Sequence, residues 1–310
     1  MAGEKPERAA GLLLVDKPAL LTSHDVVAAV RRALGERRVG HAGTLDPLAT
    51  GLLPCAVGRA TRLVRFLQSW PKTYTGCIVL GVETATGDAE SAPEHVAPVP
   101  LPPPHVLAAA LRRLTGTYLQ QPPPYSAKKI GGIPAHRIAR QGFAPRIAPV
   151  PVTVHRFRVE PRPPNRLAFA ARVSSGTYIR SLAVDLGRLL GVGAYLERLR
   201  RTAIGPLRVR AAVGLPLPGR GALLDRLLSP EQIPLPLPAI VLDPAGEADF
   251  RHGRTVPIGA HPPGTVRVLT SAGALAGLAR VDDSGGLRPQ VVFPVRCCPG
   301  GGPVVTSADA

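Results

Sequence analysis

Residues 39–53 constrain the fold most, because regular secondary structure cannot run through them. Gly43 and Gly51 allow backbone angles that are closed to other residues, and they let another molecule approach the chain closely. Pro47 biases Asp46 away from helical angles, so this carboxylate should sit on an extended or turning loop. Asp-Pro is also common turn chemistry, and these residues alone favour an ordinary Asx turn over a functional site.

A short strand and a helix are predicted to deliver the chain to this loop. The apolar run at residues 11–15 is typical of a buried strand. Thr22-Ser23 has the chemistry of a helix N-cap, and Gly35 is a natural helix stop. Between them, apolar side chains recur at helical spacing, at Val26, Val27, Val30 and Leu34.

The remaining pattern alternates strands with helices. Strands are predicted at residues 72–80, 152–159, 167–173 and 194–204, and helices at residues 60–70, 105–114 and from about residue 180 to a stop at Gly191. Proline-rich residues 92–104 indicate an exposed connector, and residues 120–129 should form a rigid irregular loop. Arg180 lies off the apolar stripe of its helix, so solvent exposure is its default expectation.

The charge balance favours a polyanionic partner. Lys plus Arg total 38 against 21 for Asp plus Glu, which gives a net charge of +17. Neutralising phosphates and releasing their counterions drives binding of nucleic acid to such proteins. The basic residues also cluster, at residues 31–32, 37–38, 112–113, 128–129 and 198–201. This clustering favours a binding face over a uniformly basic composition.

Several other classes of protein are disfavoured. The 4 cysteines have no C-x-x-C spacing, and the 8 histidines are scattered, so neither a disulfide framework nor a zinc site is expected. Apolar runs are short and broken by proline, and the start of the chain is charged, which argues against a membrane span or a signal peptide. A reducing cytoplasm fits best.

The pattern divides the chain into three parts and a tail. Residues 10–214 are expected to form one α+β domain, and the proline- and leucine-rich residues 215–237 a connector. Short strand candidates at 265–270, 275–281 and 287–293 predict a small β-rich module over residues 238–295, with a weak resemblance to a PUA-like RNA-binding barrel. Residues 296–310 are expected to be a disordered tail, which holds the unexplained pair Cys297-Cys298.

Residues 40–51 closely resemble the catalytic motif of the tRNA pseudouridine synthase B (TruB) family. One further matching segment, 17–23, precedes this motif, and four more follow it in the family's order: 81–88, 124–129, 176–180 and 199–202. Such ordered recurrence over residues 11–202 is far more specific than one motif. Leu20 and Ser91 depart from the pattern, because each stands where the family usually has glycine. The resemblance implies a pseudouridine synthase fold, with a central mixed, largely antiparallel sheet flanked by helices.

The resemblance also implies roles for individual residues. Asp46 would be the catalytic carboxylate, Arg180 its ion-pair partner, and Tyr74 the tyrosine under a flipped base. The implied substrate-binding residues are His41, Tyr74, Tyr178, Leu199, Lys17, Tyr125 and Lys129. Taken singly, a loop histidine is more often solvated, and a strand tyrosine or leucine more often belongs to the core.

The implied reaction isomerises the T-loop uridine of tRNA, position 55 in tRNA numbering, to pseudouridine. It is redox-neutral and needs no metal or other cofactor. The expected partner is the T-arm of tRNA, with a monomeric enzyme that needs no guide RNA or obligate protein partner. A guide-directed relative and a non-enzymatic RNA chaperone are the alternatives. The lysine-rich tail often seen in guide-directed relatives is absent, which disfavours the first alternative. Intact Asp46, Tyr74 and Arg180 argue against a chaperone as the sole role.

Overall fold

The computed structural model describes residues 9–96, 99–126, 128–143 and 145–293. Its largest unit is a nine-stranded sheet. In spatial order the main strands are β1 (Gly11–Lys17), β3 (Thr50–Val57), β12 (Ala194–Ile204), β4 (Lys72–Leu80), β11 (Arg166–Val173), β10 (Val150–Arg162) and β7 (Gly116–Gln120), with β2 (Val39–His41) on β3 and β13 (Leu207–Arg208) on β12. β3 and β12 run parallel, whereas the other neighbours are antiparallel. The expected mixed, largely antiparallel sheet is thereby confirmed.

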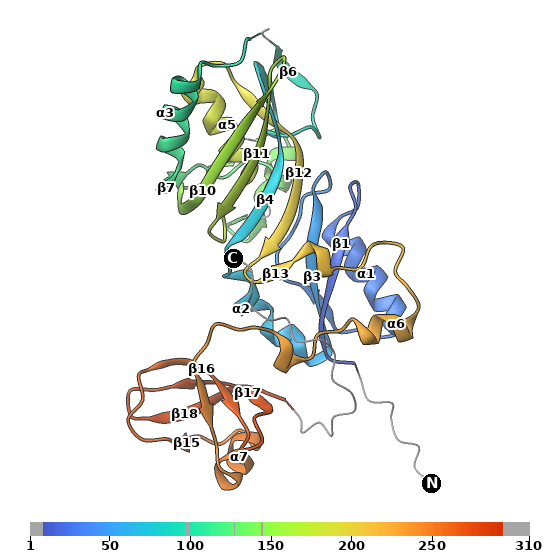
Figure 1. The fold of residues 1–310 in the computed structure, drawn as a ribbon, viewed down its shortest axis with the longest axis vertical. Coiled ribbons are helices and arrows are strands. Elements are labelled where there is room, and N and C mark those ends of the chain that lie inside the picture. Colours follow the sequence, from blue (N-terminus) through green and yellow to red (C-terminus); the bar gives the residue numbers. More distant parts are fainter. Residues whose placement is uncertain (1–8, 97–98, 127, 144, 294–310) are drawn as a thin grey trace.

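Helices cover the sheet at two places. The helices are α1 (Ser23–Leu34), α2 (Val64–Gln68), α3 (Pro104–Leu114), α4 (Ala135–Arg140), α5 (Ile179–Leu190), α6 (Arg220–Asp225) and α7 (Pro244–Arg251). α3 and α5 contact each other beside β10 and β12, while α1 lies against β1, β2 and β3 (Figure 1). One continuous apolar core joins these layers, because buried side chains of α1, α3, α5 and the sheet belong to a single cluster.

The predicted first helix is confirmed at both ends. The Thr22 hydroxyl accepts a hydrogen bond from the Asp25 amide, and the Asp25 carboxylate accepts one from the Thr22 amide, which together form a capping box. Gly35 ends the helix in the left-handed conformation, at φ 65. The side chains placed on one face by their spacing are buried: Val26, Val27, Val30 and Leu34.

Two segments differ from expectation. Residues 60–70 do not form one helix, because a 3-10 helix, η1 (Gly58–Leu63), precedes the short α2. The Thr61 hydroxyl donates to the Gly58 carbonyl at 2.8 Å and tightens that first turn, and Pro71 prevents extension beyond Trp70. The connector at 92–104 includes a strand, β6 (Pro93–Val96), which forms a two-stranded sheet with β5 (Val82–Thr84). A proline is tolerated at the first position of such an edge strand.

A second sheet carries the predicted β-rich module. Its strands, in spatial order, are β14 (Ala239–Val241), β16 (Gly264–Leu269), β17 (Leu275–Val281), β18 (Gly286–Val292) and β15 (Val256–Pro257). Phe250 of α7 is fully buried in the module's own core. The module also packs on the first unit, since Leu275 and Phe293 share a buried cluster with Leu67 and Trp70. Residues 296–310, including Cys297 and Cys298, lie outside the described part of the chain.

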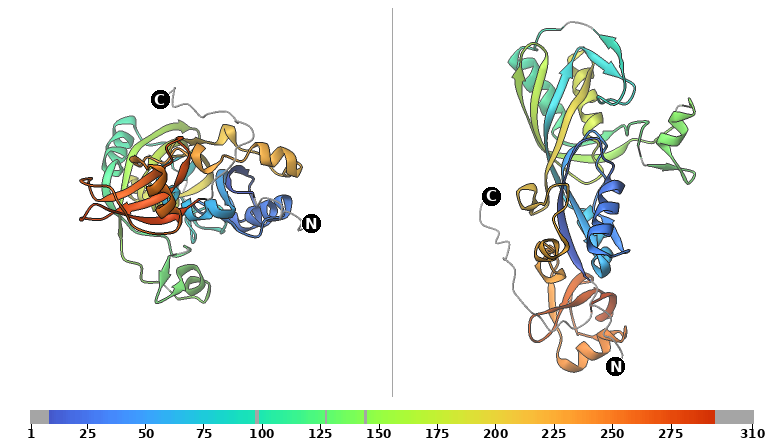
Figure 2. Two further views of the ribbon diagram at one scale, coloured as in Figure 1. Left: turned by 90° about the horizontal axis from the view of Figure 1, so that it is seen from below. Right: turned by 90° about the vertical axis from the view of Figure 1, so that its right-hand side faces the viewer.

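The stretch between the two units contains local structure of its own. Within residues 215–237 lie α6 and a 3-10 helix, η3 (Pro230–Gln232), and Leu223 of α6 is fully buried against the main core. A further 3-10 helix, η2 (Val209–Ala211), follows β13. A small hairpin of β8 (Lys129–Ile130) and β9 (Ile133–Pro134), followed by α4, projects from the body of the molecule (Figure 2).

The parallel contact between β3 and β12 requires a glycine. Gly51 pairs with Arg201 and has φ +102, and a Cβ built on Gly51 would lie 2.3 Å from the Arg201 carbonyl oxygen. Real Cβ atoms do not approach backbone this closely, so a larger residue must push the two strands apart. Gly51 therefore sets the distance between the 42–49 loop and the strand that carries Arg201.

We expect Gly51→Ala to lower the free energy of unfolding by about 3 kcal/mol, from the steric clash and the positive φ together. Gly40→Ala is the matched control in the same segment, because a Cβ there meets nothing within 4 Å; its cost should stay below about 0.5 kcal/mol. Urea unfolding of both variants measures the difference. Equal costs for the two substitutions would contradict this account of the strand contact.

Candidate active site

The loop that carries Asp46 is held from two sides. From α1, the Ser23 hydroxyl accepts from the Leu45 amide at 2.9 Å. From β12, the buried Arg201 guanidinium donates to the carbonyls of Leu52, Thr44 and Gly43 at 2.8, 3.2 and 2.9 Å. These bonds satisfy loop carbonyls that would otherwise be desolvated without partners. The Asp46 side chain remains 36% exposed and can reach a bound molecule.

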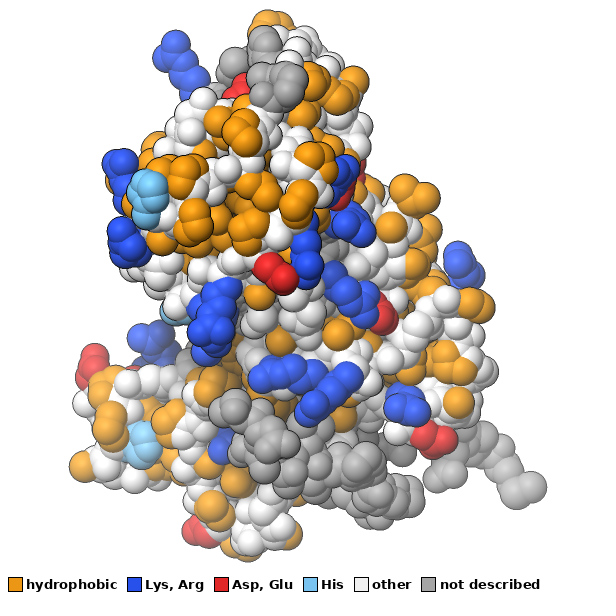
Figure 3. All heavy atoms as spheres, turned by 45° about the horizontal axis from the view of Figure 1, so that its top comes forward, with side chains coloured by type: hydrophobic (Ala, Val, Ile, Leu, Met, Phe, Trp, Pro, Cys, Tyr) orange, Lys and Arg blue, Asp and Glu red, His pale blue; other side chains and the backbone are white. Residues whose placement is uncertain are grey.

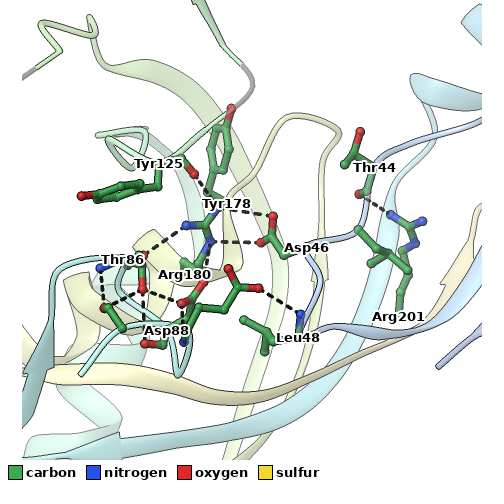
Figure 4. A network of polar contacts seen from close by, with 12 residues as sticks. Thr44, Asp46, Leu48, Thr86, Asp88, Tyr125, Tyr178, Arg180 and Arg201 are labelled. Atoms are coloured by element: carbon green, nitrogen blue, oxygen red, sulfur yellow. Dashed lines mark hydrogen bonds and ion pairs between the residues drawn. The ribbon is translucent and has the colours of Figure 1, made fainter. Parts of the chain in front are cut away.

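Arg180 reaches Asp46 from the first turn of α5, across 134 positions of sequence (Figure 4). Its Nε donates to Asp46 Oδ2 at 3.0 Å, and its Nη2 donates to Oδ1 at 3.4 Å. The exposure expected for Arg180 from its place off the apolar stripe is wrong, because the residue is only 6% exposed. Its charge faces the inside of the site, where carboxylates balance it.

Asp88 pairs with the same guanidinium, at the Nε atom that also donates to Asp46. The distance from Arg180 Nε to Asp88 Oδ2 is 3.3 Å, and the Asp88 side chain is only 1% exposed. The Thr86 hydroxyl and the Glu90 amide donate to Asp88 at 2.5 and 3.0 Å. These donors hold the Asp88 carboxylate in place, and the carboxylate in turn anchors the arginine.

Backbone carbonyls complete the environment of Arg180. Nη1 donates to Thr86 at 3.1 Å and Nη2 donates to Tyr125 at 2.9 Å. Every guanidinium nitrogen therefore has a partner, and the fork is fixed in one orientation. Of the two acids that pair with Arg180, Asp46 is the more exposed, so the arginine presents that carboxylate toward the outside.

Lys17 joins two turns beneath the site. The residue is 0% exposed, and its ammonium donates to the carbonyls of Pro18, Leu21 and Pro47 at 2.9, 2.6 and 3.1 Å. Burial lowers the pKa of Lys17 to about 8, against a smaller opposing effect of the Asp46 charge. All three N–H groups are engaged with backbone, so the geometry supports a role in shaping the Asp46 turn rather than a direct grip on a substrate.

Gln120 fixes the start of α5. Its side chain, in a residue that is 0% exposed, accepts from the Tyr178 amide at 2.8 Å and donates to the Tyr178 carbonyl at 3.1 Å. Its Nε2 also lies 2.9 Å from the Tyr118 hydroxyl. Arg180 follows Tyr178 by two residues, so Gln120 determines where both side chains enter the site.

Tyr74 and Leu199 lie on neighbouring strands of the same sheet. Tyr74 on β4 stands directly opposite Arg201 on β12, and Leu199 opposite Gly76. Side chains of directly opposed residues share a face, so Tyr74 lies on the sheet face from which Arg201 reaches the Asp46 loop. Tyr74 and Leu199 are 8% and 7% exposed and belong to the apolar core cluster. Tyr74 thus combines a core position with proximity to the loop.

His41 ends β2 at the entrance to the loop. Burial and, to a lesser degree, the charge of Arg201 lower the pKa of this histidine. The imidazole is therefore neutral at pH 7, and its Nδ1 has no hydrogen-bond partner among the described residues. This nitrogen is itself buried, so an incoming molecule would reach it only if the surrounding residues moved.

Tyr125 and Lys129 behave differently. Tyr125 contributes its carbonyl to Arg180, and Figure 4 shows its ring beside the arginine. Lys129 is exposed at the start of the projecting β8–β9 hairpin, where it pairs with Pro134. The structure thus brings Tyr125 to the site through its backbone and leaves Lys129 on the hairpin.

Three residues that organise the site were not among the predicted site residues: Asp88, Gln120 and Arg201. A signal existed for Asp88, since an acid after alternating threonines is unusual in so basic a chain, and Thr86 is its hydrogen-bond donor. Arg201 lies within a matched segment but looked like a surface charge. Gln120 gave no signal, because side-chain bonds to a distant backbone depend on tertiary contact.

Two negative observations bear on chemistry. Within residues 9–293 as described, no cluster of three or more His, Cys, Asp or Glu side chains could hold a metal ion. The same part of the chain has no helix of the length and apolar character that a membrane crossing requires.

A pH prediction follows from Lys17. Between its folded pKa of about 8 and the ordinary value of 10.5, the unfolded chain holds a proton that the folded chain has lost. The Lys17 contribution to the free energy of unfolding therefore rises with pH in that window. We compare the wild type with Lys17→Met by urea unfolding at about pH 7 and about pH 9.5. The stability difference between them should shift in favour of the wild type at the higher pH.

Comparison with Lys17→Met cancels the other titrating groups, including Lys72, whose pKa burial also lowers to about 8. A stability difference that is constant with pH, or that shifts toward the variant, would contradict the burial of a charged ammonium at this position.

Comparisons with known proteins identify relatives of the chain. Three family models match: TruB family pseudouridylate synthase (N terminal domain) at residues 31–179, tRNA pseudouridylate synthase B C-terminal domain at 180–216, and pseudouridine synthase II TruB, C-terminal, at 238–293. The tRNA pseudouridine synthase B of Parasynechococcus marenigrum (strain WH8102) is 42% identical over 91% of this chain and 97% of its own length. That of Thermobifida fusca (strain YX) is 43% identical over 91% and 98%.

Solved structures show the same fold. The archaeal box H/ACA sRNP Nop10-Cbf5 complex contains a chain with a TM-score of 0.68 and 25% identity, covering 93% of this chain and 87% of that one. A Cbf5-Nop10-Gar1 complex gives a TM-score of 0.70 at 23% identity, covering 94% and 91%. The buried Arg180 between two acids, the ordered motifs and these likenesses lead to one conclusion: the chain belongs to the tRNA pseudouridine synthase B family.

Proposed function

We propose that this protein isomerises the T-loop uridine of tRNA, position 55 in tRNA numbering, to pseudouridine, with Asp46 as the covalent catalyst. One observation carries the proposal. The Asp46 side chain is 36% exposed, whereas the side chain of its partner Arg180 is 7% exposed. A buried guanidinium therefore holds the carboxylate in a position that a substrate can reach. Membership of the family supplies the reaction class.

The reaction breaks the N-glycosidic bond, rotates the freed uracil and rejoins it to the ribose through carbon. A carboxylate suits this sequence because it can add covalently to the nucleotide and later leave. Burial opposes ionisation of such a group, whereas a close guanidinium favours it. The two bonds from Arg180 also fix the direction in which the Asp46 oxygens point. Preorganised charge of this kind lowers the barrier without reorganisation during the reaction.

The target base must leave its stack before Asp46 can reach it. Extrusion costs a few kcal/mol, which stacking and edge contacts can offset. In the proposal Tyr74 lies under the flipped base, Tyr178 and Leu199 line its pocket, and His41 holds the disrupted RNA loop open. The position of His41 at the end of β2, at the entrance to the Asp46 loop, supports that last role.

Outside the pocket, Tyr125 and Lys129 would contact RNA from the irregular loop and the projecting hairpin. Lys17 would act on the substrate through the turn that it holds. On the face shown in Figure 3, Lys and Arg side chains gather across the middle of the molecule and predominate over acidic ones. A basic surface of this kind attracts the phosphates of a tRNA.

We also propose that residues 10–214 form the catalytic domain, 215–237 a connector, and 238–295 a PUA-like RNA-binding module. The enzyme would act on the T-arm as a cytoplasmic monomer, without cofactor, guide RNA or obligate protein partner. The guide-directed alternative is favoured by one observation, the fold shared with chains from H/ACA complexes. The identity of 42% with a tRNA pseudouridine synthase B supports the stand-alone activity instead.

The test uses purified protein and an unmodified tRNA transcript, with no cofactor or guide. The wild type should form pseudouridine at the T-loop position. Asp46→Asn should lower the rate by at least about a thousandfold, because the amide cannot act as the covalent catalyst, with the RNA dissociation constant largely unchanged.

Asp225→Asn, the same chemical change at an exposed position on α6, is the matched control and should keep full activity. Binding without product by the wild type would favour the RNA-chaperone alternative. Product only after a guide RNA is added would favour the guide-directed one.

A further inference from the structure

Leu20 has a backbone conformation that its side chain does not favour. Among the described residues it is the one non-glycine with positive φ, at 69. This left-handed region crowds Cβ against the following carbonyl, and Asn or Asp enter it with the help of local side-chain hydrogen bonds that leucine cannot make. The Leu20 amide donates to the Pro47 carbonyl at 2.9 Å, which keeps the strained residue in place.

The side chain gains nothing from burial in the free protein. Leu20 is 88% exposed, the highest value among the exposed large hydrophobic residues. Neighbouring Lys17, by contrast, is completely enclosed. The backbone conformation of Leu20 therefore disfavours folding, and its side chain gains no burial in return. A glycine at this position would avoid the backbone strain. Such departures from local preference are typical of functional sites.

The position of Leu20 indicates what would cover it. Its turn rests on the turn of Asp46 and Pro47, through the Leu20–Pro47 bond and the Lys17 ammonium that bonds both turns. RNA that brings a nucleotide to the exposed Asp46 carboxylate must approach this turn. Extruding a base leaves its loop neighbours with uncovered faces, and proteins cover such faces with apolar or aromatic side chains.

We propose that Leu20 is a substrate contact, whose isobutyl group packs on the uncovered face of an RNA loop base adjacent to the extruded uridine. The inference rests on the proposed function and assigns a specificity-determining residue to that site. A phosphate partner is disfavoured because leucine has no donor. An apolar contact made equally in the ground state and the transition state contributes to binding and not to the chemical step.

The experiment separates folding from binding. Leu20→Gly removes the strain and the side chain together, and Leu20→Asn keeps a residue that tolerates positive φ but is polar. Both should have a melting temperature at or above that of the wild type. Their dissociation constants for a T-arm RNA, measured in the Asp46→Asn background, should rise roughly five- to tenfold. When the same Leu20 substitutions are made in the otherwise wild-type enzyme, kcat should stay unchanged while KM rises. This is the pattern expected when a contact made equally in the ground state and the transition state is lost.

Leu119→Thr is the matched control, because Leu119 on the edge strand β7 is also an exposed leucine, at 70%. Its dissociation constant should stay within about twofold of the wild type. Leu20 variants that bind as tightly as the wild type would overturn the contact, and so would a change in kcat alone. The dissociation constants decide this even if the wild type proves inactive, so failure of the contact and failure of the proposed activity are distinguishable.

Discussion

The site depends on one guanidinium held between two carboxylates of unequal exposure. Arg180 Nε lies 3.0 Å from Asp46 and 3.3 Å from Asp88, and the carbonyls of Thr86 and Tyr125 accept bonds from Nη1 and Nη2. Of these two acids Asp46 is the more exposed, so it is the one that the guanidinium presents to a substrate. Removing either carboxylate would change the net charge around the buried Arg180 guanidinium, so Asp46, Asp88 and Arg180 act as a unit.

The rest of the fold positions that unit. α5 supplies Arg180 at its N-terminus, where Gln120 fixes the backbone of Tyr178. β12 supplies Arg201, which bonds three carbonyls around the Asp46 loop, and Gly51 permits the close strand contact that this requires. Fixed orientation of a reacting group is one of the larger contributions to catalysis, so these supports bear directly on rate.

The sequence pattern predicted helices and strands well where the capping and turn residues agreed with the spacing of the apolar side chains. α1, with its capping box and glycine stop, and the strands β4 and β12 have the bounds that the sequence indicated. Periodicity failed at residues 60–70, where the local bond from the Thr61 hydroxyl to the Gly58 carbonyl tightens the first turn into η1. It also failed at Arg180, whose place off the apolar stripe suggested solvent. A charge on the polar side of a helix can face either water or a buried acid, and only the fold distinguishes them.

The most direct test of this account is the single-turnover rate of Arg180→Lys on unmodified tRNA. Lysine keeps the positive charge but cannot form the fork that bonds Asp46 while also reaching Asp88 and the two carbonyls. The account predicts a rate at least about a hundredfold below that of the wild type, with RNA affinity little changed. A rate equal to that of the wild type would show that charge alone suffices, and would contradict the central role given to the fixed orientation of Arg180.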